Sequence, residues 1–295
     1  MTENKRIEFR KERDFGQLIS ASFEFIKVEF KTLMRLFVYI AGPMLVFSLL
    51  ISIPSSIKTM IFVYGGGLAN NSDLSGLFGS IGWSSFASIF QGFAGLLFFV
   101  SVYEYIRLYE EGKMEITVKD VWEKVKKNFW MFFGAGILVA LMIGAGMIFL
   151  LIPGIYLAVA SSFTFMVITM ERVDVGKAIG RSMDLIKGNW WSTFGYYLVN
   201  IFIQLLIIYT VALPLIILNT TFIAGYFATG AETLPFWYYI VFTLFTIVST
   251  VITMAGSLIM YVAVSFKYFS LVEVKEQIGL KRQIAEMGNG QEQDV

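Results

Sequence analysis

Residues 128–170 read NFWMFFGAGILVALMIGAGMIFLLIPGIYLAVASSFTFMVITM, without a single charged side chain. A helix needs about 20 apolar residues to cross the hydrocarbon of a bilayer, so this stretch is long enough for two crossings. Pro153 and Gly154 lie near its middle, where proline disrupts a continuing helix and glycine favours a turn. We therefore expect two membrane-spanning helices joined by a tight turn at Pro153-Gly154.

Four further apolar runs have the same character. They cover residues 36–53 with residues 32–34 added in front, 83–103, 189–231 and 233–266. We expect the third helix of this set to end near Leu218 and the fourth to begin at Pro235. Hydrophobic residues make up 57% of the chain and charged residues 15%, against about 25% charged in soluble domains. The sequence thus predicts an all-α integral membrane protein with six transmembrane helices.

The basic residues predict how this protein is oriented. Of the 23 Lys and Arg, all but Lys58 fall in segments that the six-helix threading places on one side. Those segments are residues 1–35, 104–127, 171–188 and 267–295, while residues 54–82, the Pro153-Gly154 turn and residues 219–235 lie opposite. Cytoplasmic loops collect Lys and Arg, so we expect a multi-pass protein of the cytoplasmic (inner) cell membrane with both termini cytoplasmic.

Two features qualify this threading. Residues 57–64 form an apolar octet on the outside that is too short to span, so it is either an interfacial or re-entrant helix or an ordered part of the loop. The first 17 residues carry charge and no apolar core, so we expect no cleavable signal peptide and targeting by the first span.

Similar amphipathic segments precede the helical hairpins. Residues 14–27, DFGQLISASFEFIK, and residues 174–187, DVGKAIGRSMDLIK, share six identical positions, and KKNFW at 126–130 resembles KGNWW at 187–191. We therefore expect interfacial helices, here called elbows, at 15–30, 118–128 and 175–187, with Asp14, Thr117 and Asp174 as N-caps. Each elbow would open a repeat unit. The units are about 14–108, 117–172 and 174–268, within a single domain at 1–288 that is followed by a disordered tail at 289–295.

The third elbow shows the expected amphipathic pattern most clearly. Its apolar face consists of Val175, Ala178, Ile179, Met183 and Ile186, and its polar face of Lys177, Arg181 and Asp184. Such a helix is too charged to span and is suited to lying in the headgroup plane.

Residues that carry catalytic or metal chemistry are scarce. The chain has no Cys and no His, which excludes thiolate nucleophiles, imidazole bases and the usual transition-metal sites. The carboxylate pairs Glu110-Glu111 and Asp120/Glu123 fit a solvated, charge-balanced surface better than an active site. We therefore predict no catalytic, cofactor-binding or metal-ligating residues, no cofactor, and no nucleic-acid partner.

Polar residues near the spans fall into two groups. The charged ones lie close to the inside ends, where we expect them to extend to water, and are Lys31, Arg35, Glu104, Arg107 and Lys267. Gln91, Asn200 and Gln204 lie deeper. Asn200 and Gln204 share one helix face, which favours an interhelical hydrogen bond over a polar substrate site.

Small residues recur at four-residue spacing in the third predicted span, at Gly136, Ala140 and Gly144, with Gly134 and Ala145-Gly146 beside them. Such spacing lets two helices approach closely. We expect the partner helix within the chain, with a homodimer seam as the alternative.

Residues 152–191 combine an Ile-Pro-Gly turn, a short span, and an Ala-x-x-x-Ser elbow that closes on Lys-Gly-Asn-Trp-Trp. The positions that carry this pattern are Ile152, Pro153, Gly154, Tyr156, Ala178, Arg181, Ser182, Lys187, Gly188, Trp190 and Trp191. It resembles the bacterial membrane-domain family fused to some glycerophosphoryl diester phosphodiesterases, and related polytopic inner-membrane proteins. The resemblance implies a six-helix membrane bundle. It does not extend phosphodiesterase activity to this chain, because that activity belongs to a separate soluble barrel that uses histidine.

These observations favour a non-enzymatic multi-pass protein that organises the membrane or assists a partner complex. Its partners would be the lipid bilayer and either another protein or a second copy of the chain. The alternative is a transporter or channel for an apolar or lipid-like substrate, which needs no charge within the membrane. An intramembrane enzyme would have only Ser, Thr, Tyr and surface carboxylates with which to act.

Overall fold

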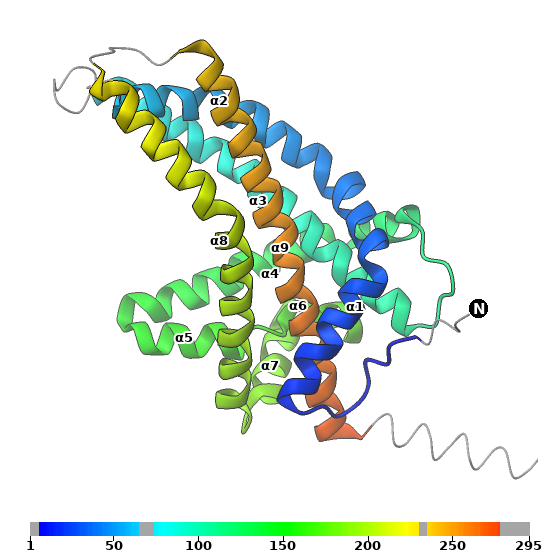
Figure 1. The fold of residues 1–295 in the computed structure, drawn as a ribbon. Coiled ribbons are helices and arrows are strands. Elements are labelled where there is room, and N and C mark those ends of the chain that lie inside the picture. The colour runs from blue at the N-terminus through cyan, green and yellow to red at the C-terminus, as the bar shows by residue number, and fades with distance from the viewer. Residues whose placement is uncertain (1–5, 65–73, 230–234, 278–295) are drawn as a thin grey trace, which may run out of the picture. The chain divides into compact units, whose positions relative to one another are not determined.

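The computed structural model describes residues 6–64, 74–229 and 235–277, and within these ranges the chain forms helices and no strands (Figure 1). The helices are α1 (Phe15–Leu36), α2 (Gly42–Tyr64), α3 (Leu74–Glu110), α4 (Val118–Phe149), α5 (Leu151–Ala160), α6 (Thr164–Glu171), α7 (Val175–Ile186), α8 (Trp190–Ala228) and α9 (Phe236–Glu276). A π-helical turn, Phe37–Ala41, joins α1 to α2. The predicted tail at 289–295 lies outside the described residues.

Six helical segments among the described residues are long and apolar enough to cross a membrane. They are Phe15–Thr59, Ile81–Glu110, Val118–Ile148, Leu151–Glu171, Trp190–Tyr226 and Phe236–Glu276. The all-α polytopic membrane fold predicted from the sequence is therefore confirmed.

Only the third elbow is a separate helix. The first is continuous with its span, because α1 passes through the π-helical turn into α2, and the second forms the start of α4. Separate first and second elbows were therefore the wrong expectation. Gly188 explains why α7 does end, since its φ of +84° is a left-handed conformation that glycine adopts freely. In the aligned pentapeptide of the second elbow, Lys127 takes the place of Gly188, and the helix continues.

The π-helical turn ends at Ala41, two residues before Pro43. A proline within a helix lacks the N–H and crowds the carbonyl four residues earlier. The backbone N–H of Gly42 bonds to the carbonyl of Phe37, which is five residues back, and the extra residue in this turn makes room for the ring. Helix α2 then continues through Pro54 to Tyr64, so residues 57–64 are its last turns rather than a separate interfacial helix or loop.

The hairpin between α4 and α5 turns three residues earlier than expected. Leu150 is extended, at φ −164° and ψ 145°, and ends α4. Pro153 instead lies in the first turn of α5, where its missing N–H has no helical partner to lose. Helix α8 also continues ten residues past Leu218, to Ala228. The expected start of α9 is confirmed, because Pro235 directly precedes Phe236.

Two glycines allow the arms of this hairpin to approach closely. A Cβ placed on Gly146 would lie 3.0 Å from Gly154 Cα, and one on Gly154 would lie 2.9 Å from Met147 N. In contrast, a Cβ on Gly136 or Gly144 would have no described residue within 4 Å. The expected close partner within the chain is thus wrong for Gly136 and Gly144. The homodimer seam stays a prediction.

Gly154→Ala is expected to destabilise the protein by about 1–3 kcal/mol, because the new methyl group meets the backbone of Met147, which cannot rotate away. Gly144→Ala is the matched control and should be neutral or stabilise by about 0.5–1 kcal/mol, since the methyl enters open space in a helix. SDS-induced unfolding in bicelles measures both. Equal effects of the two substitutions would contradict the close approach.

The helices contribute to two compact units. Unit 1 comprises Met1–Leu33, Phe99–Phe202 and Leu258–Val295. Its core includes Phe9, which is fully buried, stacks on Phe266 at 4.3 Å between ring centroids and meets Phe25 edge-on at 4.9 Å. The buried ring of Phe9 therefore anchors the charged N-terminal segment in the core of unit 1.

Unit 2 comprises Met34–Phe98 and Ile203–Ser257. Phe37 and Phe98 meet edge-on at 5.0 Å, and Trp83 Nε1 donates to the carbonyl of Ile51 at 2.8 Å. A second cluster forms around Ile223 and Tyr238, both buried.

Candidate functional site

The most unusual feature of unit 1 is a buried ion pair on the last turns of α3. The side chains of Glu104 and Arg107 are only 1% and 7% exposed, and Glu104 Oε2 lies 2.8 Å from Arg107 Nη2. The N–H of Nη2 is not directed at that oxygen, so the contact is an ion pair rather than an aligned hydrogen bond. Buried charges of this kind are the usual first place to look for function in a membrane protein.

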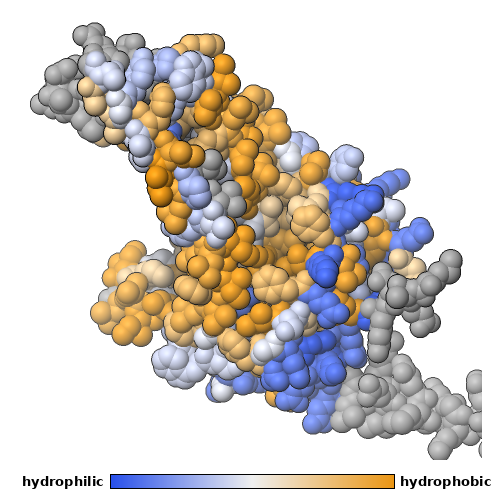
Figure 2. All heavy atoms as spheres, viewed as in Figure 1, coloured by the Kyte–Doolittle hydropathy of each residue, from blue (hydrophilic) through white to orange (hydrophobic). Residues whose placement is uncertain are grey.

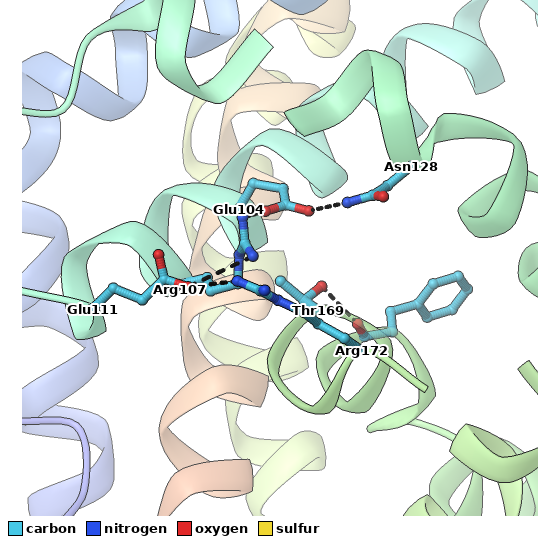
Figure 3. Close-up of polar contacts among 7 residues, drawn as sticks. Glu104, Arg107, Glu111, Asn128, Thr169 and Arg172 are labelled. Atoms are coloured by element: carbon cyan, nitrogen blue, oxygen red, sulfur yellow. Dashed lines mark hydrogen bonds and ion pairs between the residues drawn. The ribbon is translucent and has the colours of Figure 1, made fainter. Parts of the chain in front are cut away.

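Asn128 joins this pair to a second helix. It lies on α4, and its Nδ2 donates to Glu104 Oε1 at 2.8 Å (Figure 3). One carboxylate oxygen therefore has an amide partner and the other an arginine partner. The two interactions hold the carboxylate of Glu104 in place between α3 and α4.

Arg107 also reaches the connection between α6 and α7. Its Nη1 lies 3.6 Å from Glu111, and Glu111 in turn pairs with Arg172 at 3.0 Å (Figure 3). Arg172 ends α6 in a left-handed conformation, at φ 52°, which is uncommon for a residue other than glycine. Its side chain is 68% exposed, so water screens this outer pair, which is worth at most about 1 kcal/mol.

A second polar network links the ends of α6, α7 and α9. Glu171 Oε1 accepts hydrogen bonds from Arg181 Nε at 3.1 Å and from the hydroxyl of Tyr268 at 3.0 Å, and Arg181 also pairs with Glu276. Partial burial alone would lower the pKa of Arg181, but its bonds to Glu276 and Glu171 outweigh that effect and raise it. Arg181 thus belongs to the packing of three helices.

Polar contacts also tie the N-terminal segment, at residues 7–10, to the end of α3. The backbone N–H of Ile7 donates to the hydroxyl of Tyr109 at 2.9 Å, and Arg10 pairs with Glu110 at 3.2 Å. Glu110 and Glu111 therefore pair with different arginines. Lys113 and Asp120 form a further pair, at 2.7 Å. The solvated, charge-balanced surface expected for the carboxylate pairs stays a prediction.

The structure corrects the expectation that the charged residues near the span ends extend to water. Lys31 and Arg35 are exposed, as expected. Glu104, Arg107 and Lys267 are buried, and Lys267 Nζ donates to Ser192 Oγ at 3.1 Å. These three lie on the helix faces that pack inside unit 1, and periodicity within a single helix does not reveal which face that is.

Asn200 is buried, and among the described residues its side chain does not bridge to another helix. Its Nδ2 donates to the carbonyl of Tyr196, one turn earlier in α8, at 2.8 Å. The expected interhelical bond from this amide is therefore wrong. Gln91 is exposed and Gln204 is half-buried.

The arrangement is suited to holding helices together. Within the described residues, no group of three Asp or Glu side chains lies close enough to hold a metal ion, and the predicted lack of a metal or cofactor stays a prediction. A missed sequence signal is the i, i+3 spacing of Glu104 and Arg107, which places opposite charges on one face of a helix.

No family model matches the sequence, and no curated protein or solved structure matches it. The resemblance to the membrane-domain family therefore stays a prediction.

Proposed function

We propose that this chain is a non-enzymatic multi-pass protein of the cell membrane that organises the bilayer, with its basic side and both termini in the cytoplasm. It gathers anionic lipids against that side. The observation that carries this proposal is a row of four exposed lysines on the first turns of α4, namely Lys119, Lys124, Lys126 and Lys127.

The base of α4 presents these lysines away from the protein. Val121 and Val125 are fully buried on its inner face. Trp122 and Trp130 are both exposed, and Lys126 Nζ lies 5.7 Å from the centre of the Trp122 ring. Lysine beside tryptophan on one exposed helix face suits the headgroup region, where the ring sits at the interface and the ammonium meets phosphate.

The acidic residues of this stretch do not cancel its charge. Asp120 is held by an ion pair with Lys113 and by its capping bonds with Thr117. Glu123 is exposed beside the lysines, which outnumber it. The buried carboxylate of Glu104 and the exposed one of Glu111 are both paired with arginine, which supports a structural role over a catalytic one.

Clustering of anionic lipid tests this proposal. The purified chain is reconstituted into zwitterionic vesicles that hold a minor share of pyrene-labelled anionic lipid, whose excimer emission reports clustering. We expect the protein to raise excimer emission. The variant Lys124→Glu/Lys126→Glu/Lys127→Glu should abolish the rise, because each lysine near the surface contributes about 1 kcal/mol.

The matched control Lys124→Arg/Lys126→Arg/Lys127→Arg keeps the charge and should behave as the wild type. Excimer emission that is unchanged by the protein, or equal for both triple variants, would contradict the proposal. The same vesicles test the lipid-transporter alternative through dithionite reduction of a fluorescent lipid in the inner leaflet. We expect the reduced fraction to equal that of protein-free vesicles, and complete reduction would favour transport.

A further inference from the structure

The turn between α4 and α5 is apolar throughout. Residues 145–159, AGMIFLLIPGIYLAV, contain no charged, amide or aliphatic hydroxyl side chain. The tip is highly exposed, at 86% for Ile148, 69% for Leu150, 63% for Leu151 and 79% for Ile152. Figure 2 shows this end of the hairpin, at the left of the view, covered by hydrophobic side chains. So much exposed apolar surface without a polar rim calls for a hydrocarbon environment.

The return arm of the hairpin is short. Helix α5 has 10 residues, which at 1.5 Å per residue is about 15 Å, or half of a hydrocarbon core about 30 Å thick. Helix α5 ends at Ala160, and a turn at residues 161–163 separates it from α6. Ser182 Oγ donates to the carbonyl of Ala160 at 2.7 Å and accepts from the backbone N–H of Phe163 at 3.1 Å. The broken backbone is therefore satisfied by a side chain of α7.

Helix α7 defines the depth of that break. Its flanking Asp174 and its Lys177 have side chains that are 88% and 77% exposed, which places them in water or among headgroups rather than at the centre of a bilayer. Ala160, which is bonded to the buried face of the same helix, lies near that depth. The tip is consequently no more than about 15 Å beyond it.

A second contact between α5 and an interfacial residue agrees with this depth. Trp190 Nε1 donates to the carbonyl of Tyr156 at 3.3 Å, and the two rings stack at 5.7 Å between centroids. Trp190 begins α8, two residues after the exposed Gly188 and three after the exposed Lys187. Tyr156 is five residues from the start of α5, so the tip lies about 8 Å from the level of an interfacial tryptophan.

We infer that α4 and α5 form a re-entrant hairpin that dips into one leaflet and returns, its exposed apolar face covered by the acyl chains of the leaflet on the basic side. Helix α4 has 32 residues, about 48 Å, and lies obliquely to keep its tip at this shallow depth. In Figure 1 the hairpin runs crosswise to the parts of α8 and α9 that belong to unit 1.

Four crossings then remain, made by α1 with α2, by α3, by α8 and by α9. The segment from α4 to α6 begins and ends on the same side whether it crosses twice or not at all. The distribution of Lys and Arg is therefore identical in the two topologies, and charge alone does not separate them.

Single cysteines distinguish the two topologies on this Cys-free chain. Ile148→Cys and Ile152→Cys are at highly exposed positions, so neither should disturb folding, and elution as a single peak from gel filtration confirms this for each variant. Thr229→Cys, beyond α8, and Lys177→Cys, on the exposed face of α7, mark the two aqueous sides. A membrane-impermeant maleimide is applied to vesicles of each orientation.

We expect the two tip cysteines to remain unlabelled from either side, while each marker is labelled from one side. A bimane fluorophore attached at Ile152→Cys should be quenched most strongly by lipids that carry a nitroxide on the acyl chain, and only weakly by a headgroup nitroxide. Labelling of the tip from the side that labels Thr229→Cys would establish two crossings and overturn the inference. Labelling from the Lys177→Cys side would place the tip in water and overturn it as well.

The position of the hairpin does not depend on what the protein does. A tip found in the acyl chains without lipid clustering would leave the topology standing and refute the lipid-organising role. Lipid clustering together with a tip that is labelled from the same side as Thr229→Cys would support the lipid-organising role and refute the re-entrant topology.

Discussion

Arg107→Met is expected to lower the free energy of unfolding by about 3–5 kcal/mol, the range found when one partner of a buried ion pair is removed. Arg107 is the arginine that lies against the buried carboxylate of Glu104, and methionine fills a similar volume without replacing its charge. Asn128 would continue to donate to Glu104 but would not neutralise it. SDS titration in bicelles, followed by tryptophan fluorescence, measures the loss.

Two controls separate the buried pair from general effects of removing arginine. Arg172→Met breaks the exposed pair with Glu111 and should cost at most about 1 kcal/mol. The double variant Glu104→Gln/Arg107→Met removes both charges and should recover much of the loss, because no unpaired charge is left in the core. Equal losses for Arg107→Met and Arg172→Met would show that the pair is not buried in the membrane-inserted protein.

Ser182→Ala is expected to cost about 1–3 kcal/mol for each of the two backbone groups that its hydroxyl satisfies. These are the carbonyl of Ala160 and the N–H of Phe163, at the break between α5 and α6. The site is fully buried, so water does not replace the lost bonds. Unfolding in SDS gives the total, and hydrogen exchange of the Phe163 amide should accelerate.

The repeat supplies a matched control for this substitution. Ser22 is identical at the equivalent position of the first elbow and is also buried. Its hydroxyl donates to the carbonyl of Leu18 in its own helix and lies 3.3 Å from the Tyr196 hydroxyl, so Ser22→Ala should cost only about 1 kcal/mol. A larger effect at Ser22 than at Ser182 would contradict the proposed role of Ser182 in closing the break.

The comparison of these two serines shows how far a repeat in sequence predicts structure. Identical residues at aligned positions, such as Ser22 and Ser182, form hydrogen bonds with different partners. The three-unit organisation of the chain stays a prediction. Asn128 and Asn189 align in the pentapeptides KKNFW and KGNWW, yet Asn128 lies within α4 and bonds Glu104, whereas Asn189 lies in the turn before α8. Helix α7 ends just before Gly188, whereas α4 continues through the aligned residue Lys127.

Local capping was predictable because its partners are close in sequence. Thr117 forms the expected cap, with its hydroxyl accepting from the Asp120 N–H, and Asp14 accepts from the Gln17 N–H. Asp174 lies at the expected N-cap of α7, but its side chain makes no capping bond. Instead, Asp174 Oδ2 lies 3.9 Å from Lys177 Nζ.

The sequence by itself determined that this chain is an α-helical protein of the membrane, and it predicts that the basic residues lie on one side. Both properties follow from composition and order, because the transfer of a side chain into hydrocarbon depends mainly on its own chemistry. Only the tertiary structure decided that Glu104 and Arg107 are buried and that the segment after Leu150 breaks at residues 161–163. Those outcomes depend on Asn128 and Ser182, which lie about twenty residues away along the chain and reach their partners only once the helices have packed.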